Sequence, residues 1–280
     1  MTDTYFIGYD AREHEAAAVC AYSIARHTRR RSKIYLVEHR QLRSIGLFNR
    51  AWRIDAKGQY TDVKDKRPFS TEFSHSRFLV FHLARALKCT SSCAFVDCDW
   101  LFKDDPGKML REHEANRTAV SCVHRYQEIK TATKMDGMEQ HDYTRKLWSA
   151  LFAFTPSDML ADRFSPQEIN RKTGRELHGF LGMSDDEIGK LDQAWHFVPS
   201  MDRWGDDEPV PTQQDVKGIH YSEFSPWINP DHMNDSMENH ETFGDWNTAR
   251  LQMLGVAGRA GRFLHVDDLQ QDILKCTDVG

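Results

Sequence analysis

A hydrophobic run over residues 94–102 carries two acids at its centre. The segment Phe95-Val96-Asp97-Cys98-Asp99 is followed directly by Trp100-Leu101-Phe102. In an extended backbone successive side chains alternate between faces, so we expect Asp97 and Asp99 to point the same way. Two buried carboxylates need a counter-charge, and a divalent cation with positions left for phosphate oxygens would supply it. The run therefore predicts a strand that ends at a metal site, and its apolar flanks disfavour two exposed acids in a turn.

Apolar spacing predicts that strands and helices alternate through the first half of the chain. Helices are expected over residues 13–27 and 73–87, and the polar stretch 55–67 is expected to be a loop. The expected strands are Thr4–Tyr9, Lys33–Val37, Ala94–Val96 and Thr118–Val123. This order is typical of an α/β fold with a mostly parallel sheet flanked by helices. Ligands of such sheets bind at the carboxyl ends of the strands, where both Asp10 and the pair of Asp97 and Asp99 fall.

The second half of the chain is less regular. Strands are expected at Trp148–Phe154, Trp195–Val198 and Val216–Tyr221, and helices over residues 167–174 and from Thr248 onward. The proline- and acid-rich stretch 202–214 is expected to be a surface loop. No repeat divides the 280 residues, a length that one large domain can reach. We therefore expect a single domain over residues 1–280.

Composition disfavours several classes of function. The formal net charge of -5 gives no global basic field for nucleic acid. No apolar run is long enough to span a bilayer, and no signal peptide is expected. The six cysteines lack the paired spacing of a zinc site. We expect a cytoplasmic protein with reduced thiols.

Four segments of the chain resemble one class of enzymes. They are Ile7-Gly8-Tyr9-Asp10, Ser74-His75-Ser76-Arg77-Phe78, Phe95-Val96-Asp97-Cys98-Asp99, and Gly218-Ile219-His220-Tyr221 followed by Pro226-Trp227. In order and spacing they resemble glycosyltransferases of the GT-A fold (a Rossmann-like sheet), most closely the retaining enzymes of family 8 and their bacterial and phage relatives. The resemblance implies a nucleotide-binding half over residues 1–125, an acceptor and sugar half over 126–230, and a C-terminal extension over 231–280.

The resemblance assigns a purpose to the two central acids. It implies that Asp97 and Asp99 coordinate Mn²⁺ (or Mg²⁺) on the diphosphate of a nucleotide-sugar, with a UDP-linked sugar favoured. It also implies that His220 completes the site, whereas a core histidine is the alternative. An imidazole with two carboxylates suits a transition metal better than Ca²⁺.

The resemblance also implies contacts to the nucleotide-sugar. Asp10 matches an acid that contacts the base, and Tyr9 is placed to line that site, with a core tyrosine as the alternative. The full set of expected contact residues is Gly8, Tyr9, Asp10, Arg12, Arg77, Asp97, Cys98, Asp99, Lys134, Trp148 and Lys217.

Arg77 matches an arginine that contacts the donor near its sugar and diphosphate. An arginine between apolar residues of a buried helix needs a partner, which a phosphate or carboxylate would provide. A salt bridge to Asp97, Asp99 or Glu72 is the structural alternative, and it is compatible with the donor contact.

Two further acids are expected near the reacting anomeric carbon, where Arg77 is also expected to act. Asp185 and Asp186 fall where the family has an acid at this place. A helix N-terminal cap is the alternative for these residues.

The chain departs from the family pattern at two places. Trp148-Ser149-Ala150 stands where relatives have an Asn-Ala-Gly-like turn, and Trp148 is expected either as a platform for a sugar ring or as a core residue. Ser225 stands where relatives have a lysine before Pro-Trp, so Lys217 or Lys134 is expected to substitute for that charge.

The predicted function is metal-dependent transfer of a sugar from a nucleotide-sugar to an acceptor hydroxyl, with retention of anomeric configuration. One alternative is a non-catalytic nucleotide-sugar or glycan-binding protein on the same scaffold. A haloacid-dehalogenase-like phosphatase is disfavoured because its chemistry needs a threonine where Leu101 stands. The acceptor stays open between a glycan, a lipid-linked glycan, a protein and a modified nucleobase, and the oligomeric state is not predicted.

Overall fold

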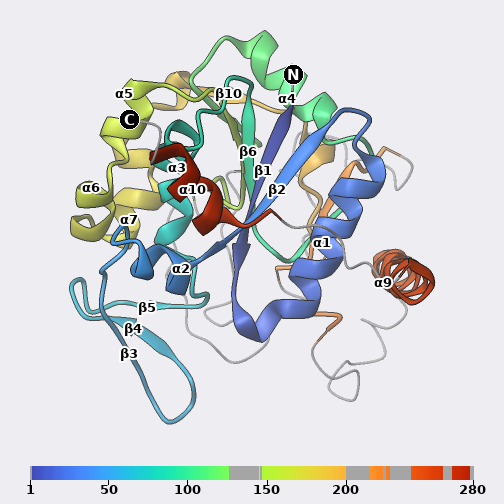
Figure 1. Cartoon of the computed structure of the whole chain (residues 1–280), viewed down its shortest axis with the longest axis horizontal. Coiled ribbons are helices and arrows are strands. Elements are labelled where there is room, and N and C mark those ends of the chain that lie inside the picture. Colours follow the sequence, from blue (N-terminus) through green and yellow to red (C-terminus); the bar gives the residue numbers. More distant parts are fainter. Residues whose placement is uncertain are drawn as a thin grey trace.

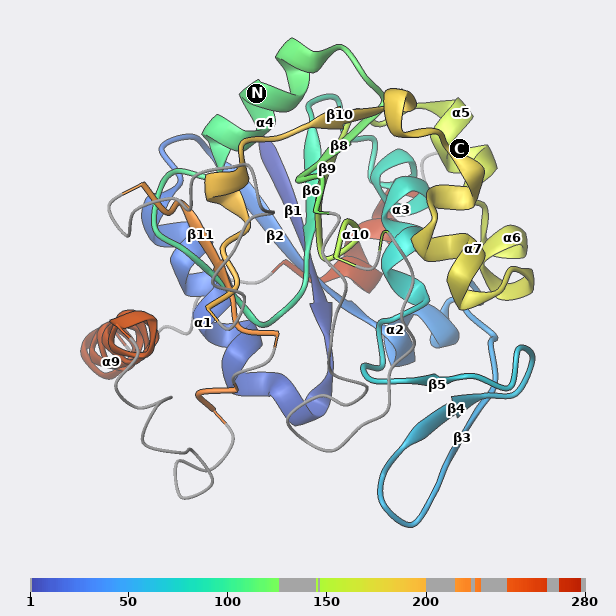
Figure 2. The same cartoon turned by 180° about the vertical axis from the view of Figure 1, so that it is seen from behind.

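A six-stranded sheet forms the centre of the computed structural model (Figures 1 and 2). The structure describes residues 2–125, 145, 147–199, 215–222, 225–227, 241–260 and 267–277. The strands in spatial order are β10 (Ile188–Lys190), β8 (Val120–Cys122), β9 (Leu151–Phe154), β6 (Cys93–Val96), β1 (Asp3–Tyr9) and β2 (Ser32–Glu38). β1 pairs in parallel with β2 and β6, and β10 with β8, whereas β9 runs antiparallel to both β6 and β8. The predicted mostly parallel sheet is confirmed.

The central strands are apolar on both faces. Every residue of β6 and β9 is buried, which is typical of strands covered by helices on each side. The rings of Phe95 on β6 and Phe152 on β9 stack with their centroids 5.3 Å apart. This packing fixes the position of β6, and with it the positions of Asp97 and Asp99, which follow the strand.

Helices cover both faces of the sheet, as Figure 2 shows. α1 (His14–His27) packs on β1, and α9 (Glu241–Ala260) packs on α1. On the other side α3 (Val80–Ala86) packs on α5 (Asp158–Arg163) and on α10 (Leu269–Thr277). α4 (Gly107–Asn116) packs against β8, β9 and β10. In the part of the chain that the structure describes, the other α-helices are α2 (His39–Ser44), α6 (Pro166–Arg171) and α7 (Gly174–His178).

Two smaller sheets lie beside the central one. β7 (Trp100–Phe102) pairs antiparallel with β11 (Gly218–His220). β4 (Tyr60–Asp62) pairs antiparallel with β3 (Trp52–Ile54) and β5 (Pro68–Phe69). This second sheet corrects the prediction of a loop over residues 55–67. Its strands are too short to show a period, and they are held instead by stacked aromatic rings and by a buried ion pair of Arg50 with Asp62.

Other predicted elements are confirmed with shifted bounds. The helix expected over 73–87 begins as a 3₁₀ turn, η2 (Ser76–Leu79), before α3. The strand expected at Trp195–Val198 is wrong, because a 3₁₀ turn, η5 (Gln193–Trp195), is followed only by a single bridge from Phe197 to Ile219. The helical tail expected from Thr248 onward consists of α9, which begins earlier, and α10. The loop expected over 202–214 lies outside the described residues.

Within the described ranges, every helix is too short or too polar to cross a membrane. All six cysteines are free thiols, and four of them, Cys20, Cys93, Cys98 and Cys122, are buried.

Because His113 on α4 is buried, we predict that the protein loses stability at acidic pH. Its ring is fully buried between Ser121 Oγ (2.8 Å from Nδ1) and Thr155 Oγ1 (3.0 Å from Nε2). Burial lowers the pKa of His113 to about 4, against about 6.5 in an unfolded chain. Between these two pKa values the unfolded state binds more protons than the folded state. The stabilisation of the folded state by a neutral, buried His113 is therefore complete above pH 6.5 and is lost as pH falls toward 4. Because pH 5 lies about 1.5 units below the unfolded-state pKa, we expect this residue to lower the free energy of unfolding by about 2 kcal/mol between pH 7.5 and pH 5, and urea titrations at these two pH values measure the change.

The control for this prediction is His113→Gln, which keeps hydrogen-bonding capacity without a titrating ring. Its stability should vary less with pH over this interval than that of the parent protein. An equal loss in both proteins would contradict the assignment to His113.

Candidate metal centre

Three buried side chains converge at the carboxyl end of β6. Asp97, Asp99 and His220 each offer one ligand atom, and these atoms lie within 4.8 Å of one another. Asp97 follows the last residue of β6, Asp99 precedes β7, and His220 ends β11. Cys98 and Asp99 form a turn between the two strands, so the acids converge through a turn and not through alternation along one extended strand. The predicted convergence is confirmed, and its predicted geometry is corrected.

Strand pairing brings His220 to the two acids. In the β7–β11 pair His220 lies opposite Trp100, next to Asp99 in the chain. The Tyr221 amide donates to the Asp99 carbonyl over 2.9 Å, which extends the pairing past the strand end. The imidazole stacks on the Trp100 ring with centroids 4.5 Å apart, and its Nε2 lies 3.3 Å from Asp99 Oδ1. A residue more than a hundred positions away thus becomes the third candidate ligand.

Gly218 on β11 allows this close pairing. A Cβ atom there would lie 2.5 Å from the Trp195 carbonyl oxygen and 2.7 Å from Trp100 Nε1. Because a backbone carbonyl cannot swing away, Gly218→Ala should push β11 from β7 and displace His220. We expect a loss of about 1–3 kcal/mol in unfolding free energy, together with weaker Mn²⁺ binding in titrations.

Gly255→Ala on α9 is the matched control, because a Cβ there meets nothing within 4 Å. It should leave Mn²⁺ binding unchanged and add up to about 1 kcal/mol of stability. Wild-type Mn²⁺ affinity in Gly218→Ala would contradict this account of the strand pair.

Arg77 provides a positive charge at the site. Its Nη1 lies 2.8 Å from Asp97 Oδ1 and donates to the Ser149 carbonyl over 2.9 Å. Its guanidinium also lies over the rings of Phe73 and Phe95, at 5.1 and 5.4 Å from their centroids. The predicted alternative of a salt bridge to Asp97 is therefore confirmed. Arg77 Nε has no hydrogen-bond partner among the described residues, which leaves one donor for another group.

The donor set fits a divalent transition metal. Asp97 and Asp99 are 7% and 4% exposed, and His220 is 2% exposed. Two carboxylates at 4–5 Å repel each other by about 3–4 kcal/mol at an effective dielectric constant of 20. Among the described residues the guanidinium of Arg77 offsets part of this repulsion, and a doubly charged ion would offset more of it. Two carboxylate oxygens and one imidazole nitrogen suit Mn²⁺, and they leave further octahedral positions open.

The residues expected at the nucleotide base lie at the end of β1. The buried Asp10 accepts from the amides of Arg12 and Glu72, and it forms an ion pair with the Arg12 side chain over 2.8 Å. Tyr9 is partly exposed, and its hydroxyl lies 3.0 Å from His14 Nδ1. A side chain at Gly8 would collide with the Phe73 ring, so packing alone explains this glycine. Asp10 therefore shapes the turn into α1 (residues 11–13 form η1), with Arg12 and Tyr9 at its surface.

Three predicted contact residues have partners within the protein. The Cys98 thiol donates to Glu13 Oε2 over 3.1 Å, on the side of α1. Trp148 is fully buried and its Nε1 donates to the Arg125 carbonyl, which agrees with the core alternative. Lys217 Nζ lies 2.5 Å from Asp192 at the far end of β11, about 10 Å along the strand from His220. Whether Lys217 substitutes for the lysine that Ser225 replaces stays a prediction, and Lys134 lies outside the described residues.

Asp185 and Asp186 lie in an exposed 3₁₀ turn, η4 (Asp185–Glu187). The cap of this turn is Ser184, whose side chain and backbone are bonded reciprocally with Glu187. Asp185 forms an ion pair with Arg145. The turn is thus built without a capping role for either acid, which leaves both carboxylates at the surface.

Sequence reasoning missed His196. This fully buried histidine lies after η5, and its Nε2 is 2.9 Å from His220 Nδ1. Burial lowers the pKa of His196, and the nearby His220 and Arg125 add to the effect. A histidine inside the apolar segment Trp195-His196-Phe197-Val198 was the available signal.

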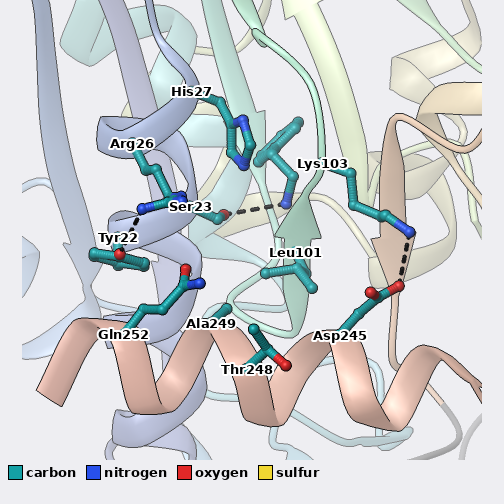
Figure 3. A pocket seen from close by; sticks show the side chains of 11 residues that line it. Tyr22, Ser23, Arg26, His27, Leu101, Lys103, Asp245, Thr248, Ala249 and Gln252 are labelled. Atoms are coloured by element: carbon teal, nitrogen blue, oxygen red, sulfur yellow. Dashed lines mark hydrogen bonds and ion pairs between the residues drawn. The ribbon is translucent and has the colours of Figure 1, made fainter. Parts of the chain in front are cut away.

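A separate cavity lies between α1, β7 and α9 (Figure 3). Its volume is about 170 Å³, and Arg26, Lys103 and Thr248 are among its lining residues. Lys103 Nζ is paired over 2.7 Å with Oδ2 of Asp245, which also lines the cavity. None of the predicted site residues is among the described residues that line this cavity, so it does not belong to the metal centre.

Comparison with solved structures identifies the fold. WbbM, a bifunctional glycosyltransferase, superposes with a TM-score of 0.55 at 13% identity, over 98% of this chain and 51% of that one. GlyE, a glycosyltransferase of Streptococcus pneumoniae TIGR4, superposes with a TM-score of 0.52 at 11% identity, over 99% of this chain and 63% of that one. The chain thus spans about half to two thirds of the length of these two proteins. It has a GT-A-like glycosyltransferase fold, as its sequence predicts.

Comparison with known sequences identifies the family. The chain is 35% identical to Protein CDI of Arabidopsis thaliana over 223 residues, which are 80% of this chain and 78% of that protein. The chain belongs to the same family as Protein CDI. No protein-family model matches it.

Proposed function

We propose that this protein is a metal-dependent glycosyltransferase that moves a sugar from a nucleotide-sugar to an acceptor hydroxyl. The observation that carries the proposal is the meeting of Asp97, Asp99 and His220 at the carboxyl end of β6 in a GT-A-like fold. Such strand ends are where open α/β sheets bind their ligands. The donor is proposed to be UDP-linked, in line with the resemblance to family 8.

The proposed reaction retains the configuration at the anomeric carbon. The acceptor oxygen forms a bond to that carbon on the face from which the diphosphate leaves, while the bond between the carbon and the phosphate oxygen breaks. The acceptor proton passes to the departing phosphate. Mn²⁺ or Mg²⁺ held at the three ligands would stabilise the negative charge of the leaving diphosphate.

The protein residues are proposed to orient the donor for this step. Arg77 holds Asp97 in place through their ion pair. The Nε group of Arg77 is proposed to donate a hydrogen bond to an oxygen of the nucleotide-sugar. Arg12 and Tyr9 are proposed to lie beside the base. Asp185 and Asp186 are proposed to contact sugar hydroxyls.

A panel of UDP- and GDP-sugars with Mn²⁺ tests the proposal. We expect UDP-sugars to raise the melting temperature in a metal-dependent way and to release UDP slowly by hydrolysis. Stabilisation by GDP-sugars alone would overturn the uridine assignment. Stabilisation without any release of nucleoside diphosphate, in the presence of candidate acceptors, would favour the non-catalytic binding protein.

A further inference from the structure

His196 and His220 form a pair of buried imidazoles behind the candidate metal centre. His196 Nε2 lies 2.9 Å from His220 Nδ1, and the opposite nitrogen of His220, Nε2, lies 3.3 Å from Asp99 Oδ1. His196 is fully buried and His220 is 2% exposed. The three groups are therefore linked in the order His196, His220, Asp99.

The backbone fixes the position of His196. The Phe197 amide donates to the Gly218 carbonyl over 2.9 Å, and the His220 amide donates to the Phe197 carbonyl over 2.7 Å. Arg125 Nη1 donates to the His196 carbonyl over 3.2 Å. The Trp100 ring contacts both imidazoles, with centroids 4.6 Å from His196 and 4.5 Å from His220. Both rings therefore pack against Trp100 of β7, which limits how either can turn.

This geometry constrains which nitrogen carries the proton. His220 faces Asp99 with Nε2, so Nε2 is the nitrogen that would bind a cation, and it must offer a lone pair to do so. Its proton must then be on Nδ1, which lies 2.9 Å from Nε2 of His196. A neutral His196 accepts this hydrogen bond only when its own proton is on Nδ1.

We propose that His196 is a positioning residue for the metal centre, which accepts the Nδ1 proton of His220 and thereby directs the Nε2 lone pair toward the cation. The inference rests on the metal dependence proposed above. Partners that hold the second nitrogen of a ligating histidine fix both its tautomer and its orientation.

In the metal-free protein the protons of the two rings are proposed to be on the opposite nitrogens. There His196 donates from Nε2 to His220 Nδ1, and His220 donates from Nε2 to Asp99. Nδ1 of His196 has no hydrogen-bond partner among the described residues, so a lone pair on this nitrogen costs less than a buried N–H group. Each ring holds one proton in both arrangements, and binding a cation exchanges one arrangement for the other.

Two variants separate positioning from packing. His196→Gln places an amide that can still accept the hydrogen bond, whereas His196→Leu fills similar space without an acceptor. Titration with Mn²⁺, followed by the electron paramagnetic resonance signal of the free ion, gives the affinity of each protein. We expect His196→Leu to bind Mn²⁺ about 10–100-fold more weakly than the wild type, and His196→Gln to retain most of the affinity. Thermal unfolding without metal reports on folding of both variants.

A measurement on the unaltered protein covers the case in which His196→Leu does not fold. Proton–nitrogen correlation spectra of the imidazoles, with and without diamagnetic Mg²⁺, should show the His220 proton on Nε2 in the free protein and on Nδ1 with the ion bound. Wild-type Mn²⁺ affinity in His196→Leu, or an unchanged His220 tautomer on Mg²⁺ binding, would overturn the role of His196 alone. If the wild type bound neither ion, this role and the proposed metal dependence would both fall.

Discussion

Asp99→Asn should abolish Mn²⁺ binding and reduce UDP release from a UDP-sugar by at least about 10³-fold. The carboxylate is one of three ligand groups within 4.8 Å, and stabilisation of a leaving group in a water-excluded site contributes several kcal/mol to the rate. The metal-free variant should be as stable as the parent or more stable, because one of two mutually repelling carboxylates is removed. Mn²⁺ titration, a coupled UDP assay and thermal unfolding measure the three effects.

Asp97→Asn provides the internal comparison. It should lose metal binding to the same extent, but it also leaves the buried Arg77 without its anionic partner. We therefore expect a loss of about 3 kcal/mol in unfolding free energy for this variant, and not for Asp99→Asn. The exposed Asp158 on α5 is the control, and Asp158→Asn should change neither property. Full UDP release by Asp99→Asn would refute the proposed metal site.

The sequence predicts well those elements that a local pattern determines, such as a run of apolar residues or an alanine-rich segment. β1 and β6 are short apolar runs bounded by polar segments, and burial on both faces accounts for such runs. The alanine-rich α1 forms a single continuous helix from His14 to His27, within the range that the sequence predicts. The two acidic ligands follow from the same logic, because burying a pair of carboxylates in an apolar run is costly unless a cation accompanies them.

The missed parts depend on contacts between distant residues. β4 holds only three residues, and its place between β3 and β5 is fixed by packing and by the Arg50–Asp62 ion pair, neither of which has a period in the sequence. The proposed positioning role of His196 depends on β11, which brings His220 beside it. Trp148 matches a donor-contact position in order along the chain, yet its depth in the core depends on how residues 147–150 turn.

Removing the charge of Arg77 should destabilise the metal-free protein more than removing either acid. Arg77→Met keeps an unbranched chain over the Phe73 and Phe95 rings but leaves Asp97 buried without its cation. Breaking one side of a buried ion pair costs about 3–5 kcal/mol. It also removes a hydrogen bond to the Ser149 carbonyl, which ties η2 to the turn before β9. We expect a clear fall in melting temperature, measured without metal or nucleotide.

The double variant with Arg77→Met and Asp97→Asn distinguishes charge pairing from packing. Because it contains no unpaired buried charge, it should recover part of the stability that the single Arg77→Met variant loses, a positive coupling in a double-mutant cycle. Arg77→Lys keeps the charge but offers one compact ammonium in place of a planar fork. It should retain more stability than Arg77→Met and yet bind UDP-sugar more weakly than the wild type, if Arg77 also contacts the donor. Additive losses in the cycle would show that packing, and not the ion pair, holds Arg77 in place beside Asp97.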